Sequence, residues 1–505
     1  MGNHRYKIPL SKADDWTRRA FIKRASLFLG AFGVPWLIRM ETMEKVSKKI
    51  FGSAVAWAQS GTPKYLISLR FRSGYQNSLI SPTEGDVSAE TFPNRNYHAN
   101  TVITVPSGAG GTGSNRPLFL SPQMATFATA HPTRMASLTS LRNITGHTNA
   151  FADSTLSQST PDWFNAHAAQ MNQIAQPSLS QGIIYGDPND ANFSALSSLG
   201  SEFTPIYVSS SDSVRGLFQA FQMKASDGTV FSQNLSNDIF SVIETNFNEP
   251  FLKLIEGRPG ASSMSAGMTK LKDLLGKNLS AQLTPSQALL DSINTQVTGG
   301  VAAPNQRLST VLGNTAADMA ELFAMAGLLF ANGITTQVGI VFETGDWHGV
   351  NARPQVGNPG NNTVQGTHAA FWSQQFTNVL NQYATNPLFQ GTSGAIGNNT
   401  YIVLTSEFSR SVADPIATPN NNDGDNRHII IIGPNGAFNA GTYGNASMND
   451  LEPIKCNPDT GADDGIGQLD RPYGYNTILK VLGIDPTDVG VSSADADKYV
   501  KAIKA

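Results

Sequence analysis

The sequence predicts an α/β protein with a mainly parallel central sheet, helices on both faces, and loop-rich and helical insertions. Two observations predict this class: near-continuous apolar runs typical of buried strands, and helical segments that alternate with them in the C-terminal part of the chain. We expect the four longest runs to share one sheet. These runs are Tyr65–Phe71, Thr336–Phe342, Tyr401–Thr405 and His428–Ile432, with shorter candidates at Ile183–Gly186 and Thr204–Val208.

Helices are predicted where apolar residues recur at helical spacing. Ala316–Ala331 is apolar on nearly all sides, which predicts a buried helix. His368–Tyr383 and Pro161–Gln173 have the spacing of amphipathic helices, and Tyr475–Leu482 predicts a short helix that closes the domain. We also expect a short helix within Phe119–Arg142.

Composition and charge exclude several classes of protein. The chain has 505 residues, with 35 Lys and Arg against 38 Asp and Glu, so its net charge is −3. A near-neutral chain is not a polybasic nucleic-acid binder, and we expect no nucleic-acid partner.

The single cysteine, Cys456, excludes an internal disulfide and cysteine-based metal clusters, and its polar neighbours predict a surface loop. A surface rich in uncharged polar residues suits an exported protein.

The N-terminus has the pattern of an export signal. Arg18 and Arg19 precede the apolar run Ala25–Ile38, which indicates a twin-arginine (Tat) signal and the Tat export machinery as a partner. The run is short for a hydrocarbon core about 30 Å thick. A small-residue cleavage motif, Ala56-Trp-Ala58, places the start of the mature chain near residue 59. We therefore expect a periplasmic or extracellular protein without a transmembrane helix in its mature chain, or an N-terminally anchored one if the signal stays uncleaved.

The domain organisation follows from this signal. Residues 1–58 are expected to be the signal peptide and residues 59–505 a single domain. Alternating helical stretches and polar turns predict a helical insertion at about residues 180–310.

Three polar loops combine histidine with carboxylates. His147 is followed by Asp153, Asp346 by His348, and Asp425 by His428. Imidazole and carboxylate ligands suit Zn or Mn, and two metals about 3.5–4 Å apart would clamp a phosphate or sulfate ester. The competing interpretation is that each histidine is hydrogen-bonded within the fold without any ligand.

That structural interpretation is preferred for His167 and His368, because both lie on predicted helices. His428 begins its strand rather than following one, so it reaches the carboxyl edge of the sheet only if its loop folds back. Glu407 follows a strand and can accept a hydrogen bond from a metal-ligating histidine, or pair with Arg410.

The order and spacing of several motifs resemble a Tat-exported bacterial family, the domain of unknown function 1501, which is similar to the sulfatase and alkaline phosphatase superfamily. The resemblance covers most of residues 61–490. The motifs that carry it are TRRAFIK at 17–23, GHTNAFADS at 146–154, GDWH at 345–348, TSEFSR at 405–410, HIIIIGP at 428–434 and YNTILKVLGIDP at 475–486.

The resemblance implies a metal-dependent hydrolase of phosphate or sulfate esters. It assigns the metal ligands to His147, Asp346, His348, Asp425 and His428. It also makes Ser78 the nucleophile candidate, with Arg427 or Arg410 stabilising the anion and Glu407 supporting a ligand.

The sequence departs from the family pattern in places. Residues 73–78 contain no carboxylate where the family carries a ligand Asp, and Asp346 and Trp347 are exchanged relative to the family order. Loss of a carboxylate weakens the binding of hard cations. We therefore expect one divalent metal, Zn or Mn, or none. The alternative function is a non-catalytic envelope or extracellular protein that keeps the fold and binds an unidentified partner.

Overall fold

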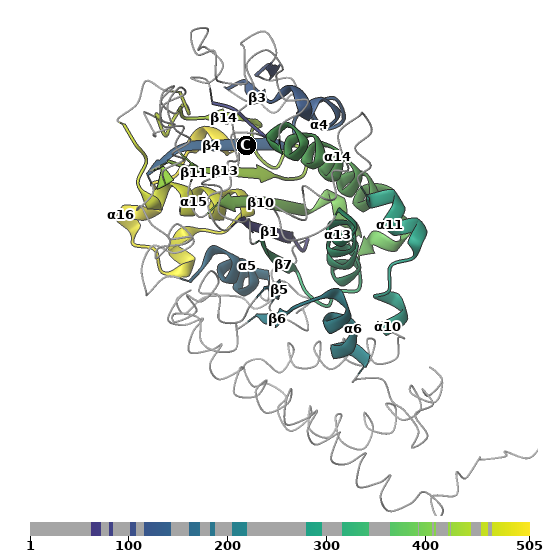
Figure 1. Cartoon of the computed structure of the whole chain (residues 1–505). Coiled ribbons are helices and arrows are strands. Elements are labelled where there is room, and N and C mark those ends of the chain that lie inside the picture. The colour runs from purple at the N-terminus through teal and green to yellow at the C-terminus, as the bar shows by residue number, and fades with distance from the viewer. Residues whose placement is uncertain are drawn as a thin grey trace, which may run out of the picture. The chain divides into compact units, whose positions relative to one another are not determined.

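The central sheet lies between two pairs of helices in the computed structural model of the chain (Figure 1). The residues that the structure describes are 62–71, 80–83, 102–107, 116–142, 161–171, 182–186, 205–219, 279–294, 316–342, 364–391, 393–406, 409–410, 423–424, 426–445, 456–462 and 467–504.

Eight strands form this sheet in the order β14-β4-β13-β10-β1-β7-β5-β6. Five of the seven neighbouring pairs are parallel, and only the two pairs that include β13 are antiparallel. The sheet is therefore mainly parallel, as predicted, with β13 reversed. The strands are β1 (Tyr65–Phe71), β4 (Met135–Arg142), β5 (Ile183–Tyr185), β6 (Ile206–Val208), β7 (Gln337–Phe342), β10 (Thr400–Ser406), β13 (Asn426–Ile432) and β14 (Gly441–Tyr443).

All four long apolar runs are strands of this one sheet, which confirms the prediction. Three two-stranded ribbons accompany it. They pair β2 (Ile103–Val105) with β3 (Leu118–Leu120), β8 (Gln390–Gly391) with β9 (Gly394–Ala395), and β11 (Ser409–Arg410) with β12 (Asp423–Gly424).

The sequence prediction missed two strands of the central sheet, β4 and the short edge strand β14. The short helix expected in this region is α4 (Ala125–Ala130), and the chain then continues as β4. Ala136 and Leu138 belong to one apolar core, while Ser137 and Thr139 alternate with them. Period-two alternation is typical of a strand, but the serines and threonines between the apolar residues weakened the signal.

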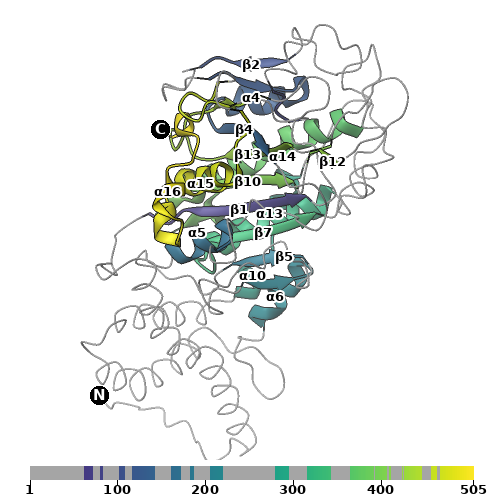
Figure 2. The same cartoon turned by 90° about the vertical axis from the view of Figure 1, so that its left-hand side faces the viewer.

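In the described part of the chain, helices cover both faces of the sheet (Figures 1 and 2). Helices α13 (Ala316–Ala331) and α14 (Val364–Thr385) lie on one face, and α5 (Trp163–Met171) and α15 (Arg471–Leu482) lie on the other. Each corresponds to a helix predicted from the sequence. The other described helices are α6 (Ser211–Gln219), α10 (Leu279–Gln282), α11 (Gln287–Ile293) and α16 (Ser493–Ala496), with single 3-10 turns η5 (Pro122–Met124), η11 (Pro387–Phe389), η12 (Ile396–Asn398), η13 (Pro486–Val489) and η14 (Lys501–Ile503).

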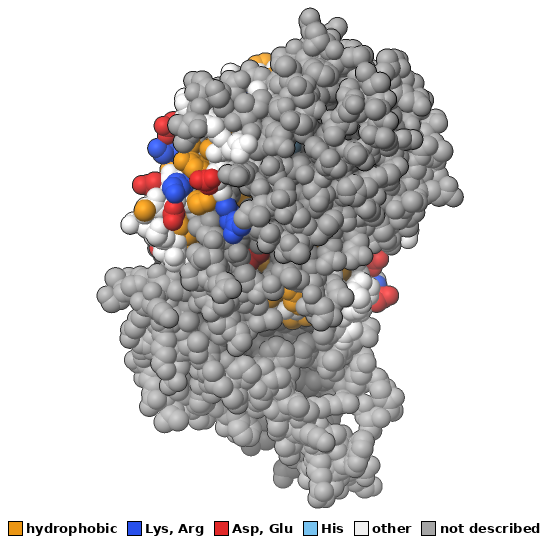
Figure 3. Space-filling model, turned by 60° about the vertical axis from the view of Figure 1, so that its left-hand side comes forward, with side chains coloured by type: hydrophobic (Ala, Val, Ile, Leu, Met, Phe, Trp, Pro, Cys, Tyr) orange, Lys and Arg blue, Asp and Glu red, His pale blue; other side chains and the backbone are white. Residues whose placement is uncertain are grey.

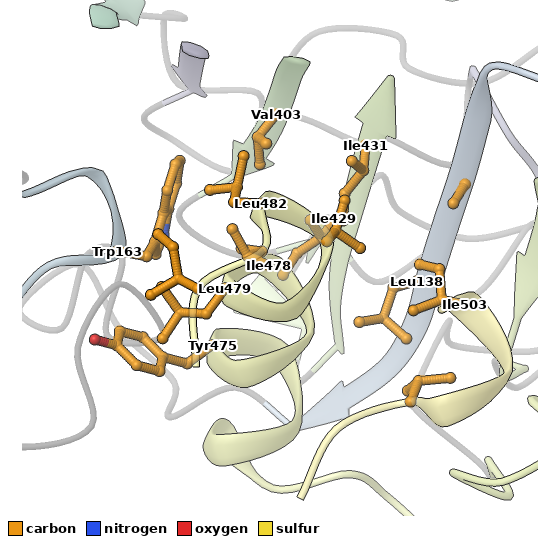
Figure 4. Packing of buried hydrophobic residues seen from close by; sticks show 14 of the residues in the cluster. Leu138, Trp163, Val403, Ile429, Ile431, Tyr475, Ile478, Leu479, Leu482 and Ile503 are labelled. Atoms are coloured by element: carbon orange, nitrogen blue, oxygen red, sulfur yellow. The ribbon is translucent and has the colours of Figure 1, made fainter. Parts of the chain in front are cut away.

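The core on the α5 and α15 face is built from apolar side chains of both helices and of the strands beneath them (Figure 4). Ile478 and Leu482 of α15 lie over Val403 and Ile431 of the sheet. The helix ends at Gly483, which adopts a left-handed φ of 79°. The backbone N–H of Ile484 donates to the Leu479 carbonyl 2.8 Å away, which completes a Schellman cap.

Cys456 belongs to the same apolar core and is fully buried, so its predicted place in a surface loop is wrong. Its backbone N–H donates to the Gly467 carbonyl at 3.1 Å. A thiol is small and weakly polar, so it packs like an apolar side chain even when its neighbours in sequence are polar.

By its contacts the chain divides into two compact units, residues 56–219 with 279–505, and residues 1–55 with 220–278. All described residues belong to the former unit. The predicted signal peptide lies outside the described residues, and the boundaries of the predicted insertion stay a prediction. Within the described part of the chain, no helix is both long enough and apolar enough to span a membrane.

Candidate functional site

Several strands of the sheet end at a common edge. In the register of the sheet, Phe71 at the end of β1 pairs with Ser406 at the end of β10 and with Phe342 at the end of β7. The sequence segments that follow these three strand ends carry Ser78, Glu407 and the pair Asp346 and His348. In sheets of this type, ligands bind outside the carboxyl ends of the strands.

The reversed direction of β13 brings His428 to this same edge. Leu404 of β10 pairs with Ile430, so the first residues of β13 lie beside the last residues of β10. Asn426, where β13 begins, pairs with Arg142, where β4 ends. No folding back of a loop is needed, because the start of an antiparallel strand lies at the carboxyl edge of its parallel neighbours.

Most candidate site residues lie outside the described residues, so their predicted convergence stays a prediction. Those outside are Ser78, His147, Asp346, His348, Glu407 and Asp425. Arg410 and Arg427 are described as strand positions. Arg410 of β11 pairs with Asp423 of β12, and Arg427 of β13 pairs with Leu141 of β4.

His428 is the one predicted ligand whose side chain the structure describes. It is 2% exposed, and its Nε2 lies in hydrogen-bond contact with Oγ of Ser137, a fully buried residue of β4. Its neighbours Ile429 and Ile431 belong to the core under α15, so alternation along β13 directs His428 to the opposite face of the sheet. Burial lowers the pKa of His428 from 6.5 to about 3, which keeps the imidazole neutral at physiological pH.

A neutral imidazole can ligate a metal, and Ser137 contacts one of the two ring nitrogens of His428 and so helps to fix the orientation of the ring. Among the described residues, no group of three or more His, Cys, Asp or Glu side chains is arranged to hold a metal ion. A complete ligand set would need donors from the segments outside those residues.

His167 has the structural role that the sequence indicates. It lies fully buried on α5, and its Nδ1 is 2.8 Å from Oε1 of Gln337 on β7. Burial lowers its pKa to about 4, so the ring is neutral and links the helix to the sheet. The side chain of His368 lies outside the described residues.

Sequence reasoning missed a buried ion pair close to the edge of the sheet. Arg70, the penultimate residue of β1, donates from its two terminal guanidinium nitrogens to Oδ2 and Oδ1 of Asp162, at 3.0 and 2.8 Å. Both side chains are excluded from solvent, at 0% and 1% exposure. The signal in the sequence was an arginine inside the otherwise apolar run YLISLRF.

Asp162 also caps helix α5. Its Oδ1 accepts a hydrogen bond from the backbone N–H of Phe164 at 2.7 Å, as an N-cap residue does. Arg70 stacks over the ring of Trp163, with the guanidinium carbon 4.8 Å from the ring centroid. The pair thus joins the end of a central strand to the first turn of a helix.

The charges on the surface differ from this buried pair in their setting. Figure 3 shows side chains of both signs interspersed on the described part of one face. Lys501 pairs with Asp459 at 2.8 Å, with the two side chains 53% and 64% exposed. Exposed pairs of this kind stabilise a protein by at most about 1 kcal/mol.

No protein-family model matches the chain, and no curated protein matches it. Among solved structures, the crystal structure of the lipoteichoic acid synthase LtaP from Listeria monocytogenes aligns over 88% of this chain and 79% of that chain, with 10% identity and a TM-score of 0.29. A TM-score this low does not establish a common fold, so the α/β class rests on the sheet topology described above.

Proposed function

We propose that this protein is a metal-dependent hydrolase of phosphate or sulfate esters that works at the carboxyl edge of its sheet. The observation that carries the proposal is the strand topology. Strands β1, β7 and β10 end at this edge, and the reversed β13 begins there with His428. The segments that carry the other candidate residues follow directly in sequence. The motif resemblance to the sulfatase and alkaline phosphatase superfamily supports the same reaction class.

The proposed roles follow that resemblance. A bound divalent metal, Zn or Mn, would neutralise the charge of the ester and lower the pKa of a coordinated oxygen. Arg410 or Arg427 would bind the anionic group. Ser78 would attack its phosphorus or sulfur atom as the bond to the ester alcohol breaks and the alcohol leaves, and water would then release phosphate or sulfate from the serine. The proposed ligands are His147, Asp346, His348, Asp425 and His428, with Glu407 accepting a hydrogen bond from a ligand.

A second function, that of a non-catalytic binding protein of the cell envelope, is favoured by two specific observations. One ring nitrogen of His428 is already engaged by Ser137 inside the fold. The segment 73–78 contains no carboxylate to serve as a ligand. On this proposal the edge of the sheet keeps a polar pocket that binds a partner without chemistry.

The two functions separate in one experiment on the exported protein. We would measure its Zn and Mn content and its hydrolysis of p-nitrophenyl phosphate and p-nitrophenyl sulfate, for the wild type and for Asp346→Ala. Asp459→Ala removes an exposed carboxylate as a matched control. The hydrolase proposal expects bound metal and activity, both lost in Asp346→Ala and kept in the control. A metal-free wild type that hydrolyses neither ester contradicts the hydrolase and supports the binding protein.

We also propose that the protein leaves the cytoplasm by the Tat route, supported by Arg18 and Arg19 ahead of the apolar run. The variant Arg18→Lys/Arg19→Lys keeps the charge of this segment. We expect its precursor to remain in the cytoplasm, as measured by cell fractionation. Normal accumulation outside the inner membrane would contradict the Tat proposal.

A further inference from the structure

The buried pair Arg70–Asp162 raises the question of why two charges are kept in the core. Replacing such a pair with well-packed uncharged side chains is often neutral or stabilising, because burying the charges costs so much solvation. The best-attested benefit of a buried polar pair is that it selects one arrangement of the packed elements. Stability alone therefore does not account for this pair.

We propose that Arg70 and Asp162 are positioning residues, which fix the carboxyl end of β1 against the start of α5 at the edge where the site lies. The inference rests on the proposed function for what the edge does. The contact between the end of β1 and the start of α5, called the joint below, is made by side chains that the structure describes.

The contacts of Arg70 fix both the distance and the orientation of the start of α5 relative to the end of β1. Two parallel hydrogen bonds between a planar guanidinium and a carboxylate hold the two groups in one plane. Nε of the same side chain lies 3.3 Å from Oγ of Ser68, two residues earlier on β1. The guanidinium also stacks on Trp163. Apolar contacts are not directional and would allow the helix to slide along the strand.

Asp162 and the preceding residue, Pro161, connect the joint to two helices. The carboxylate of Asp162 holds the first turn of α5 through the backbone N–H of Phe164. The preceding residue, Pro161, accepts a hydrogen bond through its carbonyl from the hydroxyl of Tyr475 on α15, at 2.8 Å. Residues 161–163 therefore contact the end of β1, begin helix α5 and contact α15.

The test removes both charges and keeps the cap. In Arg70→Met/Asp162→Asn, the asparagine oxygen can still accept from Phe164, and no unpaired charge is left in the core. The matched control, Lys501→Met/Asp459→Asn, makes the same change in the exposed pair. Each full-length variant is examined by thermal unfolding, by amide hydrogen exchange, and by Mn²⁺ and Zn²⁺ titration.

We expect a local effect at the two ends of the joint. Exchange should accelerate by about tenfold or more at the amides of 69–71 and 164–166 in the double variant, since these amides would open in a local rather than a global transition. The unfolding midpoint should fall by less than about 4 °C, because removal of both partners is close to neutral. The control should change neither quantity, and metal affinity should fall by about tenfold in the double variant alone.

Two results would overturn the proposal. Exchange at both ends that equals that of the wild type would show that the pair positions nothing. A uniform acceleration throughout the sheet, with a matching fall in the midpoint, would show a purely structural pair. If the wild type binds no metal, the proposed function fails while the exchange result still decides the positioning role. If the double variant does not fold, Arg70→Lys takes its place. Lysine keeps the positive charge but cannot form two parallel hydrogen bonds with a carboxylate, so hydrogen exchange must accelerate at the same amides.

Discussion

Apolar packing holds both faces of the central sheet, and one of the two faces carries a buried ion pair in addition. On the α13 and α14 face, Phe71 stacks on Phe342 with ring centroids 4.8 Å apart, and Trp372 meets both rings edge-on. On the α5 and α15 face, an apolar core surrounds the buried pair Arg70–Asp162. Because neighbouring residues of a strand point to opposite faces, Arg70 and Phe71 belong to different faces although they are adjacent in sequence.

The difference shows how one strand can be both anchored and positioned. Aromatic packing buries a large apolar area, and its strength depends on volume more than on exact orientation. A bidentate ion pair adds little net stability after desolvation but permits only one geometry. We therefore expect apolar packing on both faces to supply most of the free energy of unfolding, and the buried pair on the α5 and α15 face to set the register at the edge.

The largest loss of stability is expected from a substitution in the aromatic packing on the α13 and α14 face. Trp372→Ala removes a fully buried ring that also stacks on Phe376 at a centroid separation of 5.1 Å. The free energy of unfolding should fall by about 3–5 kcal/mol, as for other large-to-small core substitutions. Urea unfolding measures this, and Trp372→Phe, which keeps an aromatic ring, should lose clearly less. Equal losses in both variants would mean that ring packing is not what holds this face.

An intermediate effect is expected from the pH dependence of stability, which we test on one buried histidine from each face of the sheet. Burial lowers the pKa of His428 to about 3 and that of His167 to about 4, both from 6.5. The unfolded chain therefore takes up protons below pH 6.5 while the folded chain does not, so stability present above pH 6.5 is lost as the pH falls toward 4. Each histidine should contribute a loss of about 2 kcal/mol between pH 7 and pH 5.

Urea unfolding at the two pH values, for the wild type, His428→Gln and His167→Gln, isolates each contribution. Each variant should show a smaller difference between pH 7 and pH 5 than the wild type. A variant with an unchanged difference would show that its histidine is already protonated in the folded protein or does not titrate in this range.

The smallest expected effect concerns the end of α15. Lys64 donates from Nζ to the Leu482 carbonyl at 2.7 Å, in the last turn of the helix, where a cation is favourable. Lys64→Met keeps the aliphatic stem and should cost about 0.5–1 kcal/mol in thermal or urea unfolding. Lys501→Met, which removes the exposed partner of Asp459, is the control and should cost less. The reverse order would assign the stabilisation to the surface pair.

Local pattern was sufficient to predict most strands of the sheet and the helices that cover it. The runs at β1, β7 and β10 are apolar on both faces, and such runs form buried strands wherever they pair. The spacing of apolar residues in α14 and α15 likewise predicted both helices. By contrast, β4 alternates apolar residues with serine and threonine, and its identity as a strand depends on its partners β13 and β14.

Local sequence pattern was enough to predict the α/β class, six of the eight strands of the sheet and the residue types that follow their ends, because burial and periodicity are local properties of the chain. The strands β4 and β14, the direction of β13, the burial of Cys456 and the partners of His428 and Arg70 became known from the three-dimensional structure. Each of these depends on residues far apart in sequence. Strand direction depends on how the chain returns to the sheet, and a charge becomes a buried partner only when another element supplies the opposite charge, so neither can be derived from a local pattern.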